Sequence, residues 1–150
     1  MYLNNKQSFT FGFIILALVF FIACEKTIET SKIIGFGSRV ELKQTESIWF
    51  GADSLTGLQV RVNEITDSRC PEDVNCVWAG EAKVDLLAVQ TQDSVNLKLT
   101  IDPTNTYQID TLDFTLNSKN YKALLFAVDP YPNTKNEGAK FATLTVLQSN

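Results

Sequence analysis

The sequence predicts an all-β fold: a single β-sandwich of about seven to eight strands over residues 33–150, preceded by an N-terminal signal peptide. Three observations support this prediction. Apolar and polar residues alternate in short runs, turn-forming residues separate these runs, and no helical periodicity appears after Ile33. Short strands at this spacing favour Greek-key, immunoglobulin-like connections, and a barrel is the alternative.

The N-terminus has the pattern of an export signal. Lys6 is the only charged residue before Glu25, and the run Phe11–Ala23 is apolar except for Gly12. A run of about thirteen residues is too short for a membrane span of about twenty and suits the apolar part of a signal peptide. Removal of residues 1–23 would leave 12 basic and 17 acidic residues, a net charge of −5.

The signal ends in Phe21-Ile22-Ala23-Cys24, which resembles a bacterial lipobox. The resemblance implies that Cys24 is lipidated and becomes the mature N-terminus, and multiple acyl chains anchor a protein firmly. An ordinary cleaved signal with a buried cysteine is the alternative. We expect residues 24–32 to be the lipidated end and a polar tether. The expected location is the bacterial cell envelope, at the outer membrane, on its periplasmic face or at the surface.

Two kinds of strand are expected in the domain. Strict alternation, typical of half-buried strands, occurs in five runs: 40–43, 58–62, 95–101, 112–116 and 142–146. Two runs, 82–89 and 123–128, are more continuously apolar, so we expect them to lie centrally with both faces covered. Turn signals separate the runs at residues 51–53, 55–57, 102–105 and 117–120.

Residues 67–80, which read DSRCPEDVNCVWAG, concentrate the special residues of the chain. Cys70 and Cys76 suggest either a small disulfide loop or half of a metal site. A structural zinc site takes four ligands, normally thiolates or imidazoles, whereas this chain has no histidine and its third cysteine is Cys24. We therefore predict a Cys70–Cys76 disulfide in an oxidising compartment, and no metal or other cofactor.

The neighbours of these cysteines have two interpretations each. Asp67 and Arg69 form a buried pair that fixes the loop, which we favour, or Arg69 is an exposed recognition charge. Trp78 is interpreted as a core residue, with a ligand platform as the alternative. The alternation of residues 74–78 indicates the start of a strand, and Gly80 indicates a bulge or a close backbone approach.

The run Asp67-Ser-Arg-Cys-Pro, followed by Val74-x-Cys76-x-Trp78-Ala-Gly80, resembles a motif of small secreted lipoproteins of the Bacteroidota type. With its flanking strands, the resemblance covers about half of the mature chain. It implies an exported all-β domain with a disulfide loop, and it implies no particular activity.

A second candidate loop lies at residues 129–138, which contain two prolines and Tyr131. Long loops of this kind can bind ligands on a rigid scaffold, but a solvated connection with Tyr131 packed on the rim is favoured. Taken together, the two loops supply the candidate binding residues: Arg69, Pro71, Glu72, Asp73, Asn75 and Tyr131.

The residue inventory argues against an enzyme. No histidine is available as the base of a nucleophilic triad, and no phosphate-binding loop, Ser-x-x-Lys, HExxH or EF-hand pattern occurs. Two carboxylates could hydrolyse a glycan, yet nothing distinguishes a pair. The acidic net charge argues against nucleic acid and anionic headgroups as partners.

Two functions remain. In the first, the domain is a binding or adhesion module that captures an unknown envelope protein or glycan with the disulfide-stapled loop. One form of it is an inhibitor that presents residues 71–75 as a rigid loop. In the second, the domain is a structural accessory subunit of an envelope complex, and the disulfide only adds stability. In both, the N-terminal lipid provides the contact with the membrane.

Overall fold

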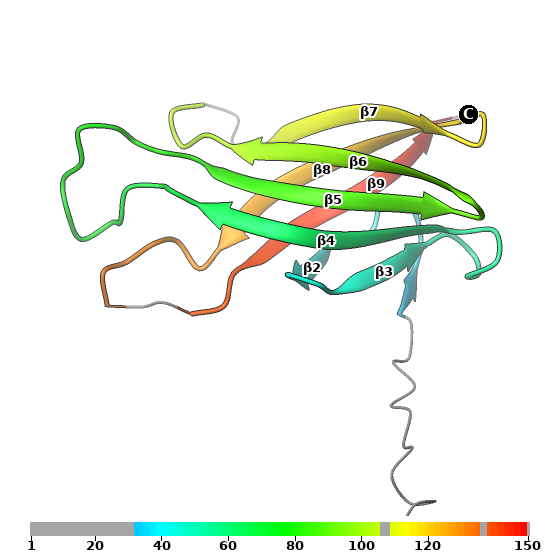
Figure 1. Cartoon of the computed structure of the whole chain (residues 1–150), viewed down its shortest axis with the longest axis horizontal. Coiled ribbons are helices and arrows are strands. Elements are labelled where there is room, and N and C mark those ends of the chain that lie inside the picture. Colours follow the sequence, from blue (N-terminus) through cyan, green and yellow to red (C-terminus); the bar gives the residue numbers. More distant parts are fainter. Residues whose placement is uncertain (1–31, 106–108, 136–137, 150) are drawn as a thin grey trace, which may run out of the picture. The chain divides into compact units, whose positions relative to one another are not determined.

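The computed structural model describes residues 32–105, 109–135 and 138–149, so the predictions for Cys24, the signal peptide and most of the tether lie outside the described residues. The described part forms nine strands in two sheets that pack face to face, and it contains no helix (Figure 1). The predicted all-β sandwich is therefore confirmed. Among the described residues, no helix is long and apolar enough to cross a membrane.

One sheet has five strands in the order β1-β3-β4-β5-β6. Its members are β1 (Ile33–Ile34), β3 (Ser47–Phe50), β4 (Leu58–Asp67), β5 (Ala82–Gln90) and β6 (Asp93–Ile101). Neighbours are antiparallel except for β1 and β3. Strands β3 to β6 follow one another as a meander, so this sheet differs from those of immunoglobulin domains, in which strands from separate parts of the chain are neighbours.

The other sheet has four antiparallel strands in the order β2-β9-β8-β7. Its members are β2 (Val40–Lys43), β7 (Asp110–Leu116), β8 (Lys119–Asp129) and β9 (Phe141–Ser149). Strands β7, β8 and β9 are connected in series, and the early strand β2 lies beside β9. This is a Greek-key order read from the C-terminal end, and strands β3 to β6 of the other sheet lie in the long connection between β2 and β7.

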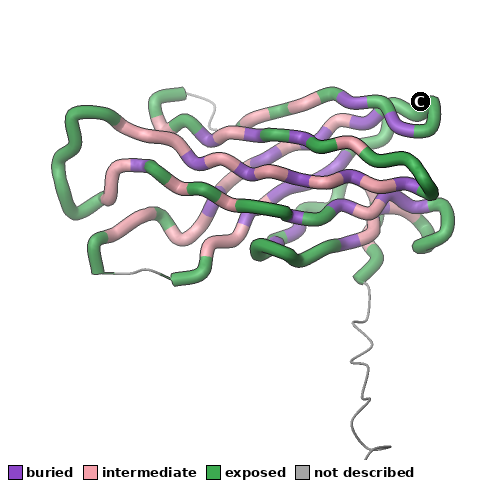
Figure 2. Tube along the Cα trace, viewed as in Figure 1, coloured by how far each residue is buried: buried purple, intermediate pink, exposed green. Residues whose placement is uncertain are grey.

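The hydrophobic core lies between the sheets because alternate residues of the strands point inward, with the alternation interrupted at the register shifts of β4 and β8 (Figure 2). On β5, Val84, Leu86 and Ala88 are buried, and the residues between them are half-buried. Strands β5 and β8 do lie inside their sheets, each between two partners. The expectation that both of their faces are covered is wrong for both strands, since the outer faces of β5 and β8 are only half-buried.

Two strands are absent from the sequence-based prediction, β1 and β3. Strand β3 has only four residues, and its Ile48 and Phe50 are completely buried while the intervening Trp49 is half-buried. The turn expected at residues 117–120 is present: Asn117 and Ser118 have φ angles of 48° and 61° and connect β7 to β8. Two successive positive φ angles are typical of tight hairpins.

The two ends of the sandwich carry different features. Strand β1 pairs with Trp49 and Phe50, and Phe50 pairs with Leu58, the first residue of β4. The loop that joins β4 to β5 begins after the last residue of β4, and a strand of this length spans about 30 Å. The N-terminal strand and this loop therefore lie at opposite ends of the domain (Figure 1).

Candidate binding loop

The stapled loop (residues 68–81) connects β4 to β5 and contains the predicted disulfide. Cys70 and Cys76 are bonded, with their Cα atoms 5.8 Å apart. This separation lies in the range that a disulfide requires. Closing so small a ring bends residues 71–75 into a compact turn at the end of the sandwich. The disulfide prediction is confirmed.

The base of the stapled loop is closed by two backbone hydrogen bonds. The Ser68 amide donates to the Glu81 carbonyl at 2.9 Å, and the Cys70 amide donates to the Ala79 carbonyl at 2.7 Å. Gly80 lies where the two arms meet, with a φ of +69°, and a Cβ there would come within 1.9 Å of the Ser68 carbonyl oxygen. The close backbone approach predicted for Gly80 is therefore present, and only glycine fits it.

A buried ion pair lies directly beneath the loop. Arg69 donates from Nε and Nη2 to the two carboxylate oxygens of Asp67, at 2.8 and 2.7 Å. The two side chains are 5% and 4% exposed. The Nη2 atom of Arg69 also donates to the Val128 carbonyl of β8 at 2.6 Å, so the pair links the two sheets. The interpretation of Asp67 and Arg69 as a buried pair is confirmed.

The β8–β9 loop (residues 130–140) completes the surroundings of this pair. The Arg69 guanidinium carbon lies 4.4 Å from the centre of the Tyr131 ring, and the Lys140 ammonium lies 3.0 Å from Asp67 Oδ2. Burial alone would raise the pKa of Asp67. Hydrogen bonds from Arg69 and Lys140 outweigh this effect and hold the pKa below its usual value.

Acidic side chains join the stapled loop to the β8–β9 loop. The Glu72 amide donates to the Pro132 carbonyl at 3.0 Å, and Asn133 Nδ2 donates to Glu72 Oε1 at 2.9 Å. The Thr134 amide donates to Asp73 Oδ1 at 3.0 Å, and the Thr134 hydroxyl donates to the other carboxylate oxygen. These bonds from Thr134 lower the pKa of Asp73. Each loop therefore supports the other.

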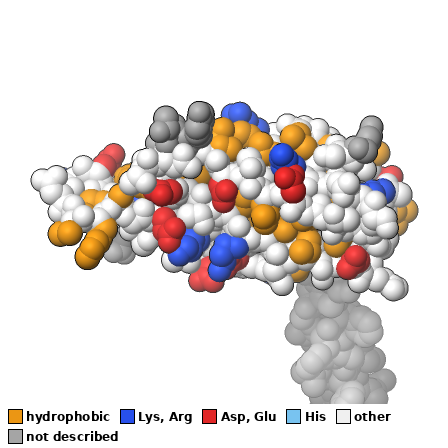
Figure 3. Space-filling model, turned by 90° about the horizontal axis from the view of Figure 1, so that it is seen from above, with side chains coloured by type: hydrophobic (Ala, Val, Ile, Leu, Met, Phe, Trp, Pro, Cys, Tyr) orange, Lys and Arg blue, Asp and Glu red, His pale blue; other side chains and the backbone are white. Residues whose placement is uncertain are grey.

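The tip of the stapled loop presents apolar side chains to solvent. Val77 is 88% exposed, Trp78 is 81% exposed and Val74 is 45% exposed. Figure 3 shows hydrophobic side chains projecting at the end of the sandwich where the loop lies. The prediction that Trp78 belongs to the core is wrong. The strand predicted from residues 74–78 is also wrong, because the disulfide turns this segment away from the sheet and β5 starts only at Ala82.

The structure gives the predicted binding residues different environments. Arg69 is buried, so the alternative of an exposed recognition charge is excluded. Glu72 and Asp73 are exposed but hold the β8–β9 loop, and Asn75 is exposed in the stapled loop. Tyr131 is 38% exposed and packs beside Arg69 at the rim.

Pro71 is half-buried. Sequence reasoning missed Val77 and the exposure of Trp78. The signal that could have found them is their position directly after Cys76, on a segment that the disulfide holds away from any partner strand.

Among the described residues, no group of three or more His, Cys, Asp or Glu side chains could hold a metal ion. Comparison of the chain with known protein families, with curated proteins and with solved structures found no match.

Proposed function

We propose that the chain is a lipid-anchored binding module of the bacterial cell envelope that captures a partner with the tip of the stapled loop. The observation that carries the proposal is the exposure of Val77 and Trp78, 88% and 81%, on a loop whose backbone is held from several sides. A large apolar side chain gains free energy when it leaves water, so a tip of this kind favours contact with another surface.

Rigidity makes this exposure useful for binding. The disulfide, the backbone bonds at the base and the contacts with Asn133 and Thr134 fix the loop before any partner arrives. Preorganisation reduces the ordering cost of association, and tryptophan is enriched among the residues that dominate binding energy. If the domain acts as an inhibitor, the residues that it presents are therefore Val74, Val77 and Trp78 at the tip, in place of residues 71–75.

The position of the N-terminal strand supports capture away from the anchoring membrane. If Cys24 is lipidated, residues 25–32 connect the lipid to β1 and reach roughly 25 to 30 Å when extended. Strand β1 lies at the end of the sandwich opposite to the stapled loop (Figure 1). The favoured partner is an envelope protein with an apolar pocket, because the uncharged side chains of Trp78 and Val77 form a compact apolar anchor.

The test is cross-linking of the full chain in its native envelope, followed by purification of the covalent adducts. We expect adducts with wild type and their loss with Val77→Ser/Trp78→Ala. The matched control is Leu55→Ser, which changes another apolar side chain that is 84% exposed, in the turn between β3 and β4. Identical adducts from all three proteins would favour the accessory-subunit function, in which the loop only stabilises the fold.

A further inference from the structure

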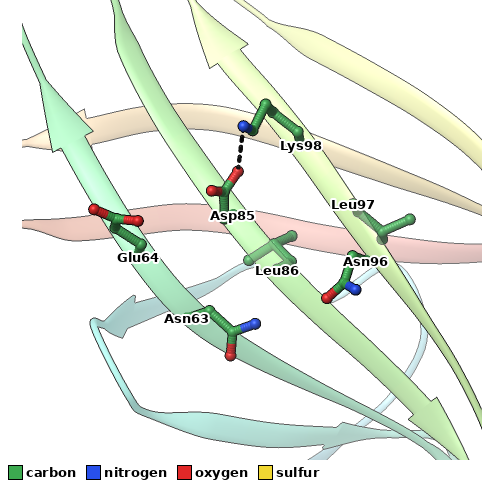
Figure 4. A pocket seen from close by; sticks show the side chains of 7 residues that line it. All are labelled: Asn63, Glu64, Asp85, Leu86, Asn96, Leu97 and Lys98. Atoms are coloured by element: carbon green, nitrogen blue, oxygen red, sulfur yellow. Dashed lines mark ion pairs between the residues drawn. The ribbon is translucent and has the colours of Figure 1, made fainter.

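We infer a second binding site, for the hydroxyl groups of a saccharide, on the outer face of the five-stranded sheet. This site is separate from the stapled loop and does not rest on the function proposed above. It is a shallow depression of about 350 Å³ formed by β4, β5 and β6 (Figure 4). Its volume lies at the lower end of the range for small-molecule sites, roughly 300 to 1,000 Å³.

A β-bulge builds the depression. The register of β4 against β5 shifts between Val62 and Glu64, which leaves Asn63 without a partner residue on β5. Bulges bend the strand and redirect side chains. Beyond the bulge, Glu64 pairs with Asp85, and Asp85 pairs with Lys98 on β6. Three adjacent strands therefore contribute one polar row across the sheet.

The depression offers side chains with free hydrogen-bonding capacity. Within the part of the chain that the structure describes, the side chains of Asn63, Glu64 and Asn96 make no hydrogen bond or ion pair. Asp85 Oδ1 forms an ion pair with the Lys98 ammonium at 3.4 Å, and this buried oxygen accepts no hydrogen bond. The carboxylates of Glu72 and Asp73 in the stapled loop differ, since both are engaged with the β8–β9 loop.

The balance of these groups favours a neutral, hydroxyl-rich ligand. The Asn63 and Asn96 amides both donate and accept hydrogen bonds. The Glu64 and Asp85 carboxylates accept them, and the Lys98 ammonium donates them. A hydroxyl group can donate and accept, so it can bond to every one of these side chains. Two carboxylates beside one ammonium repel an anion. A divalent cation would need more carboxylate or carbonyl ligands and no adjacent ammonium.

Apolar surface lies beside the polar row on the same face. Leu87 is half-buried and pairs with Arg61 and Asn96 in the next row. A sugar ring has hydroxyl groups at its edge and C–H groups on its faces, so it can use both kinds of surface. Because the depression is open and shallow, we expect millimolar affinity for a monosaccharide, about −4 kcal/mol.

The test uses the full chain in a detergent without a sugar headgroup. Saturation-transfer NMR is recorded with the methyl glycosides of glucose, galactose, mannose and N-acetylglucosamine, and a glycan array extends the search to longer ligands. We expect binding of at least one probe and a loss of about tenfold in affinity with Asn63→Ala/Asn96→Ala, because each amide supplies hydrogen bonds to the ligand.

Two variants control for the position of the site. Gln148→Ala removes an exposed amide from β9 in the other sheet, and Trp78→Ala changes the tip of the stapled loop. Both should bind the probe as wild type does. The inference is overturned if no glycoside or glycan binds, if Asn63→Ala/Asn96→Ala binds normally, or if Trp78→Ala abolishes binding. The last result would place saccharide binding on the loop.

Discussion

Arg69 and Asp67 form a two-point ion pair at the end of β4, and the same guanidinium holds the Val128 carbonyl of the opposite sheet. The pair is therefore a link between the sheets as well as a support for the stapled loop. Burial removes water from both charges, and only complete hydrogen bonding compensates for that loss. Lys140 and the Tyr131 ring contribute to this compensation.

Replacement of Arg69 by alanine should strongly destabilise the domain. The change leaves the Asp67 carboxylate buried with Lys140 as its remaining cationic partner, and breaking a buried pair costs about 3 to 5 kcal/mol. Chemical denaturation measures the difference in the free energy of unfolding. The control is Lys83→Ala, which breaks the half-exposed pair with Glu81 and should cost less than about 1 kcal/mol. Equal losses in the two variants would contradict the structural role given to Arg69.

The stabilising effect of the Asp67 charge should disappear in acid. The folded-state pKa of Asp67 is lowered, so its charge stabilises the fold fully above the unfolded-state pKa of about 4, and this contribution is lost as the pH falls through the folded-state value. We expect the difference in unfolding free energy between wild type and Asp67→Asn to be constant from about pH 5 to about pH 7, because Asp67 is charged in both the folded and the unfolded state over this range. It should shrink below about pH 4. A difference that grows in acid would show the opposite linkage.

Gly80→Ala should open the base of the stapled loop. The new Cβ would overlap the Ser68 carbonyl, and the residue would keep a left-handed conformation that costs about 1 to 2 kcal/mol for alanine. The predicted loss of stability is more than about 2 kcal/mol, measured by thermal and chemical unfolding. Gly35→Ala is the control, because its Cβ would meet its nearest neighbour at an ordinary 3.8 Å.

Much of the fold could be predicted because burial on one face produces a period of two. Strands β2, β6 and β7 show it, since most of their outward residues face water, and β9 shows it because its outward Thr143 and Thr145 are polar although they are half-buried and buried. Strand β3 was not predicted because four residues are too few to show a period of two, and Trp49 between Ile48 and Phe50 makes the segment uniformly apolar.

The candidate site was harder to predict because its contacts join distant parts of the chain. The pairing of Asp67 with Arg69 follows from their closeness in sequence, whereas no local pattern indicates that Val128 and Lys140 meet them. Trp78 was misassigned since large aromatic residues are usually buried. Its exposure depends on how the disulfide and the β8–β9 loop hold the segment, which composition does not reveal.

Cys24→Ala should leave the protein unprocessed or release it from membranes. The expectation rests on the apolar run that ends in Ala23-Cys24. Loss of the acyl chains removes an anchor in which each buried CH₂ group contributes about 0.8 kcal/mol. Membrane fractionation and intact mass measure the outcome, and globomycin should block processing of wild type. Unchanged processing under both treatments would refute the lipoprotein proposal.

Protein purified from its native envelope should contain no free thiol. Cys70 and Cys76 are bonded to each other, and Cys24 is expected to carry lipid. Alkylation without prior reduction should therefore leave the intact mass unchanged, and reduction should expose two alkylatable thiols. Two thiols that react without reduction would show that the bond does not form in the cell.

Loss of the disulfide should weaken the domain without unfolding it. In the chain-entropy description, opening so small a ring costs about 2 to 3 kcal/mol. The core contains no atom of this loop, and the bonds from Asn133 and Thr134 to the loop remain in Cys70→Ala/Cys76→Ala. We expect this variant to fold with an unchanged far-ultraviolet spectrum and a Tm lower by about 10 °C.

Reduced wild type should have the same Tm as the double variant, because both proteins lack the Cys70–Cys76 bond. Affinity for the loop's partner should fall by more than the loss of stability suggests, since a freer loop around Val77 and Trp78 must be ordered again on binding. The control is Leu55→Ser, which leaves the disulfide and the loop intact and should keep full affinity. A double variant with wild-type affinity would show that the disulfide contributes stability alone and that preorganisation of the tip is unnecessary.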